Sequence, residues 1–488
     1  MPPRTARRSP RSPRSPRPAR PARPRAVLAV VLLGVFAFAL LQSLINPVLP
    51  RLQEELGTTQ THITWVVTAF LLSASVFTPV LGRLGDRYGK DRMLVVALAA
   101  LAVGSLLSAA ATGIGVMIAG RAVQGVGGSV LPLAFGIVRD ELPRERIPGA
   151  IGLASALTAV GGGSGVVLAG PLEDALGIRA LFWLPMVLTA VAAVAARIVV
   201  PPSPSRNDGP VSWASALLMA GWLIALLVPL TQAPVWGWSS GRVLGPLVAA
   251  VALAAAWIAT ERRSAGPLVD MRMLRVPAVW TTNLVSLLLG ASVFAVLGFM
   301  PAFLQTSPES GYGFGASVTR AGLLLLPMTV AMSVAGPVSV RLTRLVGART
   351  VLTSAAALNA LALAGLALRH DRAWQAVVAM VLLGTAFGGA VATMSNIVVA
   401  AVHPGQTGVA AGVNANVRTV GGALGAALMG GIVGARAGDG GLPAEAGYTC
   451  GFAVLALAGL GAVLAAWLVP REGTAEPAPA EHPIAVRS

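Results

Sequence analysis

Long uninterrupted apolar runs are the feature of this 488-residue sequence that most restricts its fold. A helix needs about 20 mainly apolar residues to cross the hydrocarbon core of a bilayer, and many runs reach that length. The chain is 55% hydrophobic with a mean hydropathy of +0.75. Soluble domains have an apolar share of only about 45–50%. The sequence therefore predicts a polytopic membrane protein.

The predicted fold class is an all-α integral membrane protein, because lipid offers no hydrogen-bond partner to an open strand edge. The expected membrane helices are fourteen, at residues 26–49, 62–81, 93–112, 114–137, 149–170, 179–199, 211–230, 243–260, 278–303, 321–340, 350–369, 374–400, 407–434 and 449–469.

The chain has a net charge of +17, and its basic residues are most concentrated in residues 1–25, which carry nine arginines and no acid. Proline and arginine at this density cannot build a core, so we expect a disordered arm. We also expect the Pro-rich tail, 470–488, to be disordered. Because the other basic residues lie mostly in short loops between spans, the charge favours a membrane surface, with no nucleic-acid partner.

Basic residues also predict the orientation. With the amino terminus inside, 27 Lys and Arg lie on the cytoplasmic side, seven outside and two within spans. This positive-inside bias places both termini of a multi-pass plasma-membrane protein in the cytoplasm.

A faint internal repeat suggests two copies of one bundle. The charged stretch from Gly82 is echoed from Val340 at an offset of 258 residues, and the pair Gly161 and Gly165 is echoed at nearly the same offset. Spans seven and eight are then an inserted pair. The predicted parts are the basic arm (1–25), a first six-helix bundle (26–199), a linker with two extra transmembrane helices (200–277), a second six-helix bundle (278–469) and the tail (470–488).

The stretch GRLGDRYGKDRML places six charges in its first eleven positions, in a chain only 11% charged. Its pattern, Gly-x-x-x-Asp-Arg-x-Gly-Lys-x-Arg, resembles the signature of the major facilitator superfamily in the link between the second and third spans. The glycines permit close helix approach and a tight turn. Asp86 can accept from a neighbouring helix amino end and pair with Arg87 or Arg92. We predict a gating motif of Gly82, Asp86, Arg87, Gly89, Lys90 and Arg92.

In the fourth span, AGRAVQGVGGS places Arg121 and Gln124 one helical turn apart, which resembles the fourth-helix motif of the superfamily. A buried arginine in lipid is costly unless it faces a cavity or a partner. We therefore expect this pair to supply cavity or coupling charge. The alternative is a structural arginine bonded to backbone carbonyls.

The fifth span resembles the antiporter motif that marks exporters of the superfamily, although Val166 and Ala169 depart from it. Small residues at four-residue spacing let two helices approach and slide, and plain tight packing would select the same residues. The predicted antiport hinge is Gly152, Gly161, Gly165 and Gly170.

Residues 26–469 together resemble the fourteen-helix drug:proton antiporter subfamily of multidrug and antibiotic exporters. The first span, LLQSLINPVLP, matches the first-helix motif of that subfamily at Leu40, Asn46, Leu49 and Pro50. The resemblance implies the major facilitator fold, with two six-helix bundles around a midplane cavity plus two inserted helices. It also implies that no cofactor is needed and that a proton gradient supplies the energy.

The sequence departs from that subfamily at Leu41, where an aspartate is common, and no carboxylate falls in the middle of a predicted span. Proton coupling needs a group whose protonation alternates between the two sides, and mid-membrane acids usually serve. Asp86, Glu173 and Asp174 are the substitutes that we consider.

The predicted cavity offers basic and amide groups but no acid. Since a dicationic drug would need a countercharge, we expect a small neutral or anionic amphipathic substrate. Beyond Arg121 and Gln124, the candidates are Gln42, Asn46, Asn283, Gln305, Asn396, Asn414, Asn416 and Arg418; helix–helix hydrogen bonding is the alternative role of each amide.

Other chemistries fit less well. Lys90 is the only lysine and is followed by Asp91, so no ATP-binding P-loop is present. The four histidines are scattered and Cys450 is the single cysteine, so no metal site and no internal disulfide are expected. We predict a monomeric transporter rather than an enzyme, exporting an antibiotic or toxic metabolite. The alternatives are a facilitator or uptake symporter for a small organic solute and a non-transporting membrane sensor.

Overall fold

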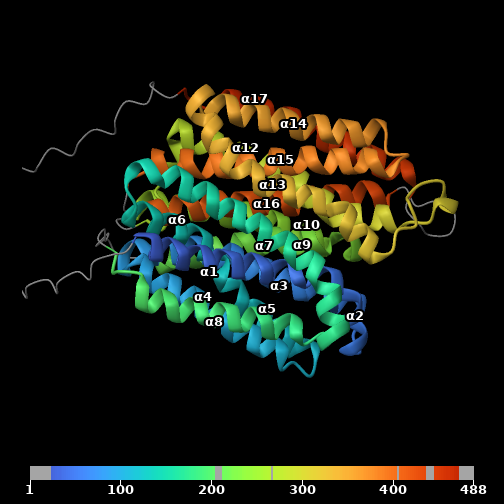
Figure 1. The fold of residues 1–488 in the computed structure, drawn as a ribbon, viewed down its shortest axis with the longest axis horizontal. Coiled ribbons are helices and arrows are strands. Elements are labelled where there is room, and N and C mark those ends of the chain that lie inside the picture. Colours follow the sequence, from blue (N-terminus) through green and yellow to red (C-terminus); the bar gives the residue numbers. More distant parts are fainter. Residues whose placement is uncertain (1–23, 204–211, 265–266, 404–405, 436–443, 472–488) are drawn as a thin grey trace, which may run out of the picture.

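The computed structural model describes residues 24–203, 212–264, 267–403, 406–435 and 444–471 (Figure 1). Within these ranges every regular element is an α-helix or a short 3-10 helix, and no strand occurs. The arm and the tail that the sequence predicts to be disordered lie outside the described residues, except for a few positions next to the first and last helices.

Fourteen helical stretches are long and apolar enough to cross a membrane, which confirms the predicted number. They are α1 (Pro24–Leu44), α3 (Gln60–Tyr88), α4 (Lys90–Ala109), α5 (Ile114–Gly125) continued through η2 (Val126–Ser129) by α6 (Val130–Glu141), α7 (Ile147–Leu176), α8 (Ala180–Val199), α9 (Trp213–Trp236), α10 (Gly241–Arg263), α12 (Pro277–Gln305), α13 (Val318–Val346), α14 (Ala348–Leu368), α15 (Ala373–Ala401), α16 (Thr407–Gly434) and α17 (Glu445–Trp467). The shorter helices are η1 (Asn46–Val48), α2 (Leu49–Glu55), η3 (Arg144–Arg146), α11 (Met271–Arg275) and η4 (Pro308–Ser310).

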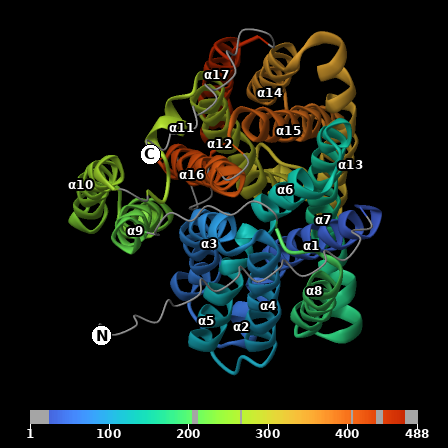
Figure 2. The ribbon, with the colours of Figure 1, turned by 90° about the vertical axis from the view of Figure 1, so that its left-hand side faces the viewer.

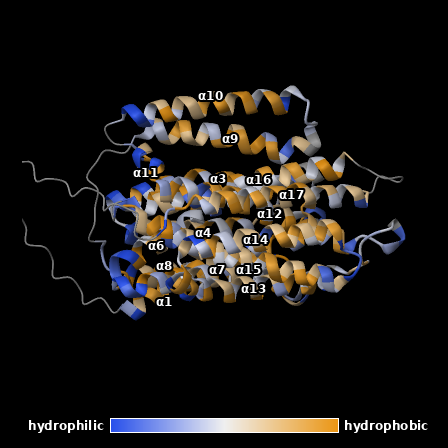
Figure 3. Cartoon of the chain, turned by 90° about the horizontal axis from the view of Figure 1, so that it is seen from above, coloured by the Kyte–Doolittle hydropathy of each residue, from blue (hydrophilic) through white to orange (hydrophobic). Residues whose placement is uncertain are grey.

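The helices lie roughly side by side, with apolar residues along their bodies and hydrophilic residues gathered at their ends (Figure 3). Such a distribution suits helices whose bodies face lipid and each other while their ends reach water. Because the number of spans is even, α1 begins and α17 ends at the same end of the molecule. We call this the inner end and the opposite one the outer end.

The first six spans, α1 to α8, and the last six, α12 to α17, form two bundles, which we call the first and second halves (Figure 2). Across their boundary α3 packs on α16, and α7 packs on α13. The inserted pair α9 and α10 lies outside both halves, where α9 contacts α3 and α16.

A buried carboxylate holds the inner end of the inserted pair together. Glu261 of α10 accepts hydrogen bonds from the backbone N–H of Leu268 at 2.9 Å and of Val269 at 3.2 Å, and also from the hydroxyl of Ser215 on α9. These donors satisfy the charge that burial would otherwise make costly. They also hold Leu268 and Val269, which precede α11, against α10.

Glycines at corresponding places in the two halves make similar close contacts. An added Cβ at Gly161 of α7 would lie 2.8 Å from the Phe36 carbonyl of α1, and one at Gly421 of α16 would collide with the Leu287 carbonyl of α12. The fifth helix of each half therefore needs glycine to lie against the first helix of the same half. The link between the second and third helices of each half also matches, because Gly89 and Gly347 both have positive φ, +111° and +84°.

The gating motif occupies the end of one helix and the start of the next rather than a loop, which corrects the expected end of the second span. Helix α3 continues past residue 81 to Tyr88, and Gly89 alone separates it from α4. No helix breaker follows Gly82 and Gly85 until Gly89, whose left-handed backbone ends the helix. Asp86 and Arg87 therefore belong to α3, and Lys90 and Arg92 belong to α4.

Candidate functional site

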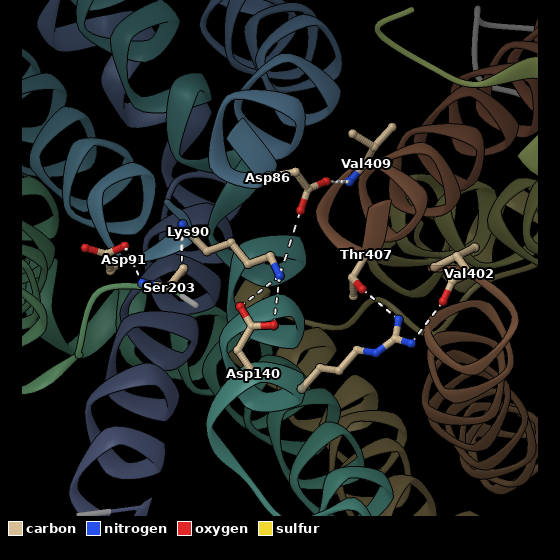
Figure 4. Close-up of polar contacts among 9 residues, drawn as sticks. Asp86, Lys90, Asp91, Asp140, Ser203, Val402, Thr407 and Val409 are labelled. Carbon is tan, nitrogen blue, oxygen red and sulfur yellow. Dashed lines mark hydrogen bonds and ion pairs between the residues drawn. The ribbon is translucent and has the colours of Figure 1, made fainter. Parts of the chain in front are cut away.

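The inner end is closed by contacts between α3 and the start of α16. The backbone N–H of Val409 donates to the fully buried carboxylate of Asp86 over 3.3 Å (Figure 4). Gly82, one turn earlier, lies so close to α16 that an added Cβ would be 2.7 Å from the Gly408 carbonyl. Asp86 therefore meets the amino end of a neighbouring helix, where the helix dipole favours a carboxylate.

The cation that pairs with Asp86 is Lys90, at 3.9 Å, and not Arg87 or Arg92 as the sequence suggests. Gly89 turns the chain between α3 and α4, and the pair is made across this turn. Arg87, the next residue after Asp86 on α3, points to another side of that helix. Arg87 instead stacks over Tyr88, with its guanidinium 5.0 Å from the ring centre. Arg92 is exposed.

Two residues of α6 complete the closure, and the sequence analysis did not single them out. The Lys90 ammonium donates to Asp140 at 2.9 Å. Arg139 donates to the Thr407 hydroxyl at 2.7 Å and to the Val402 carbonyl at 2.9 Å, across the boundary between the halves (Figure 4). The sequence feature that could have pointed to them is an Arg–Asp pair at the inner end of an apolar span, where unpaired charge is costly.

We call the following set the inner gate: Asp86, Lys90, Arg139 and Asp140, together with Val402, Thr407 and Val409. Burial of its charges is costly unless each is paired and hydrogen-bonded. Here the pairing requires both halves, since α16 supplies partners to Asp86 and to Arg139. Separation of the halves at this end would expose those partners to water.

Arg121 and Gln124 are hydrogen-bonded to each other at 2.7 Å. Arg121 also donates to the Val66 carbonyl at 3.1 Å, and its guanidinium lies 4.5 Å from the ring centre of Phe70. Gln124 donates to Ser105 at 3.1 Å. The pair therefore lies inside the first half, behind an aromatic ring that itself borders the central cavity.

A central cavity of about 170 Å³ lies between the halves. Arg418 is the one charged side chain among the described residues that line it. The other lining residues are Phe38, Gln42, Phe70, Leu71, Ala74, Ser75, Thr78, Gly128, Leu131, Ser155, Thr158, Phe294, Met332, Phe387, Gly388, Val391, Ala415, Asn416 and Thr419. Its wall is thus aromatic and apolar with a few hydroxyls and amides, which is typical of a small-molecule site.

Arg418 has no hydrogen bond or ion pair with any other residue that the structure describes. It lies on α16 about 14 Å beyond Val409, given 1.5 Å of rise per residue. An unpaired guanidinium in a low-dielectric cavity is an unsatisfied charge, and an anionic group would satisfy it.

Of the predicted cavity residues, Gln42, Asn416 and Arg418 border the central cavity. Asn414 donates to Asn283 at 2.9 Å and so joins α16 to α12. Asn414 also borders, with Arg418, a small hollow next to the cavity. The remaining amides bond within their own helices, Gln305 to Pro301 and Asn396 to Ala392. The Asn46 side chain lies outside the described residues.

The predicted hinge glycines have different neighbours. Gly152 faces the second half, where an added Cβ would lie 2.7 Å from Val340 of α13. Gly161 and Gly165 face α1, and Gly170 has nothing within 4 Å. Three of the four glycines therefore permit close packing.

The other carboxylates considered for coupling lie at the outer end. Glu173 pairs with Arg51 at 3.3 Å, and Asp174 is exposed. Neither borders the central cavity.

Comparison with known proteins identifies the family. The sequence matches the Major Facilitator Superfamily over residues 31–426 and again over 312–486. Similar proteins include the tetracenomycin C resistance and export protein of Streptomyces glaucescens, 28% identical over 84% of this chain and 76% of that protein. The cephamycin export protein CmcT of Amycolatopsis lactamdurans is 30% identical over 85% of this chain and 86% of that protein. The drug efflux pump JefA of Mycobacterium tuberculosis is 26% identical over 83% of this chain and 79% of that protein.

A solved structure has the same fold. The human organic anion transporter MFSD10 superposes with a TM-score of 0.68 at 17% identity, covering 91% of this chain and 99% of the other. The match of the sequence over most of its length, the fourteen spans and the shared fold lead to one conclusion: the chain belongs to the Major Facilitator Superfamily of membrane transporters.

Proposed function

We propose that this protein exports a neutral or anionic amphipathic antibiotic or toxic metabolite across the plasma membrane by alternating access, in exchange for protons. The observation that carries the proposal is the central cavity, where Arg418 is the one charged group among the described lining residues and has no partner there. Three similar proteins, two of them named as antibiotic exporters and one as a drug efflux pump, support the export direction.

The orientation follows from the positive-inside rule. With 27 basic residues on one side and seven on the other, we place the inner end, and both termini, in the cytoplasm. The closed inner gate then separates the central cavity from the cytoplasm. Export requires the gate to open for loading and to close again before release.

We assign the coupling proton to Asp86. A neutral carboxyl would lose the ion pair with Lys90 and the charge-assisted bond from Val409, so protonation would weaken the hold of α3 on α16. The other charged groups around it are Arg83 on the same helix and Arg139 and Asp140 on α6. With Asp86 neutral, Asp140 remains to pair with Lys90, so the gate can open without stranding the lysine.

Substrate shape and charge follow from the cavity wall. Phe38, Phe70, Phe294 and Phe387 offer aromatic surface to a planar apolar body, and Arg418 offers a countercharge to a carboxylate or phenolate. Neutral compounds need only the aromatic wall and the hydroxyls. A cation would face Arg418 with no acid among the described lining residues. The proposed transport needs no cofactor and takes its energy from the proton gradient, and we propose that a monomer suffices.

Accumulation assays in an efflux-deficient bacterial host test the proposal. Cells that express the chain are given labelled neutral, anionic and cationic antibiotics, with and without a protonophore. We expect lower accumulation of neutral or anionic compounds, restored by the protonophore. Increased accumulation of any compound would favour an uptake symporter or facilitator, and unchanged accumulation of all of them would contradict export.

A further inference from the structure

A second cavity, of about 450 Å³, lies at the inner end of the second half, where α13 ends, α14 begins and α17 ends. Its lining includes Arg349 and Arg471, the indole of Trp467, and the hydroxyls of Thr350, Thr353 and Ser354. No acidic side chain is among the described residues that line it. The cavity is separate from the central one and has no part in the proposed transport route.

The matching place in the first half is filled by the chain itself. Ser203, which follows α8, accepts from the Lys90 N–H at 3.0 Å, and its own N–H donates to Asp91 at 3.1 Å (Figure 4). Asp91 thus carries negative charge at the start of α4, where the helix dipole favours it.

The second half keeps the backbone of this junction but reverses its charge. At the repeat offset of 258 residues, Ala348 stands for Lys90 and Arg349 stands for Asp91. The chain that follows the last helix contributes Arg471 where the first half has Ser203, and no side chain caps the start of α14 among the described residues. The result is a cationic cavity where the first half has hydrogen bonds between Ser203 and the start of α4.

The side chains around this cavity suit a phosphate group. Two guanidinium groups and helix N-terminal N–H groups together bind phosphate oxygens, and three hydroxyls can add hydrogen bonds. Arg349 lies 4.8 Å above the ring centre of Trp467. The stacking fixes the guanidinium beside the opening.

Exposed apolar side chains adjoin the cavity. Trp467 is 62% exposed, and Leu345 and Leu468, next in sequence to lining residues, are 80% and 57% exposed. Tryptophan is enriched at the level of lipid head groups, and leucines exposed beside it would face acyl chains. A ligand with both a phosphate and alkyl chains matches the charge of the arginines and the apolar surface beside them. We propose that this cavity binds the phosphate head group of an anionic phospholipid from the surrounding leaflet.

The test uses the purified full chain in detergent, with its melting temperature measured during titration with phosphatidylglycerol, phosphatidylcholine or inorganic phosphate. The variants are Arg349→Ala, Arg471→Ala and the double variant. Arg341→Ala, an exposed arginine on α13 outside the cavity lining, is the matched control. Because Arg471 follows the last helix, Arg471→Ala should fold even if changes at Arg349 do not.

We expect phosphatidylglycerol, but not phosphatidylcholine, to raise the melting temperature. Each arginine removed should raise the half-saturating lipid concentration about fivefold, since a basic residue near anionic lipid contributes about 1 kcal/mol. The control should behave as the wild type. Equal effects of the two lipids, or an unchanged response in the double variant, would overturn the proposal. An equal shift with inorganic phosphate alone would show a soluble anion as the ligand and overturn the lipid assignment.

Discussion

Helix α16 carries two of the interactions on which the proposed function depends, one at its start and one farther along. Asp86 of α3 holds the start of this helix through the Val409 N–H, and Arg418 faces the central cavity farther along. A movement of α16 that releases Asp86 therefore also moves the group proposed to hold the substrate. This shared helix gives gating and binding a physical connection.

Replacement of Asp86 by Asn tests whether the charge of this carboxylate is needed for transport. The amide can still accept from Val409 but carries no charge, so it imitates the protonated carboxyl. A charged hydrogen bond contributes about 1.5–3 kcal/mol, so we expect efflux to fall at least about tenfold. A cysteine at Thr158, in the central cavity of a Cys450→Ser background, should become more reactive to a thiol reagent applied from the cytoplasm.

Asp371→Asn, an exposed carboxylate outside the gate, is the control for this change and should have no effect. Efflux by Asp86→Asn at the wild-type rate, with its dependence on pH intact, would exclude Asp86 as the coupling residue.

Arg418→Gln tests substrate charge at the cavity. Loss of a charge-assisted bond of about 1.5–3 kcal/mol predicts a tenfold or larger fall in the export of anionic compounds. Neutral compounds should be exported nearly as before. The control is Arg320→Gln, an exposed arginine at the start of α13, and the readout is the ratio of anionic to neutral transport. An equal loss for both classes of compound would mean that Arg418 is structural.

At the scale of helices, α7 provides a matched pair of glycines. A Cβ at Gly165 would lie 2.8 Å from the Leu40 carbonyl of α1, whereas Gly170 has nothing within 4 Å. Overpacking of this kind costs about 1–3 kcal/mol. We expect Gly165→Ala to lower the melting temperature in detergent and to reduce transport, while Gly170→Ala changes neither. Equal melting temperatures for the two variants would contradict the close packing of α7 on α1.

The sequence predicts the positions of the helices better than it predicts the contacts between their side chains. Apolar run length is a local property, so all fourteen spans could be recognised. The charged stretch after residue 81 predicts a loop there, but α3 continues to Tyr88 because Asp86 is buried and paired at the helix end. Partners distant in sequence, such as Arg139 with Thr407, need the tertiary structure and left no periodic signal.

Tertiary structure also separates the polar residues of the spans into two groups. Arg121 and Arg418 are both arginines within apolar helices, yet one has protein partners and the other borders a cavity without them. Sequence alone gives the cost of each charge in the membrane but not the group that compensates it. The second, cationic cavity likewise becomes visible only when the two halves are compared.

For the molecule as a whole, proposed export across the membrane requires both termini to lie in the cytoplasm. A fluorescent protein fused after Ser488 should fluoresce in a bacterial host, and alkaline phosphatase fused at the same point should be inactive. The expectation rests on 27 basic residues on one side of the membrane against seven on the other. Active phosphatase would show that the molecule has the opposite orientation, with the inner gate on the outer side of the membrane.

Transport by the purified protein in proteoliposomes tests the central claim most directly. Vesicles with the inner end outward receive an imposed pH gradient, acidic inside, and a fluorescent aromatic carboxylate is added outside. We expect the dye to accumulate against its gradient while protons leave the vesicles. Asp86→Asn should show neither movement. Dye movement that ignores the pH gradient, or that only follows the dye gradient, would contradict proton-coupled export.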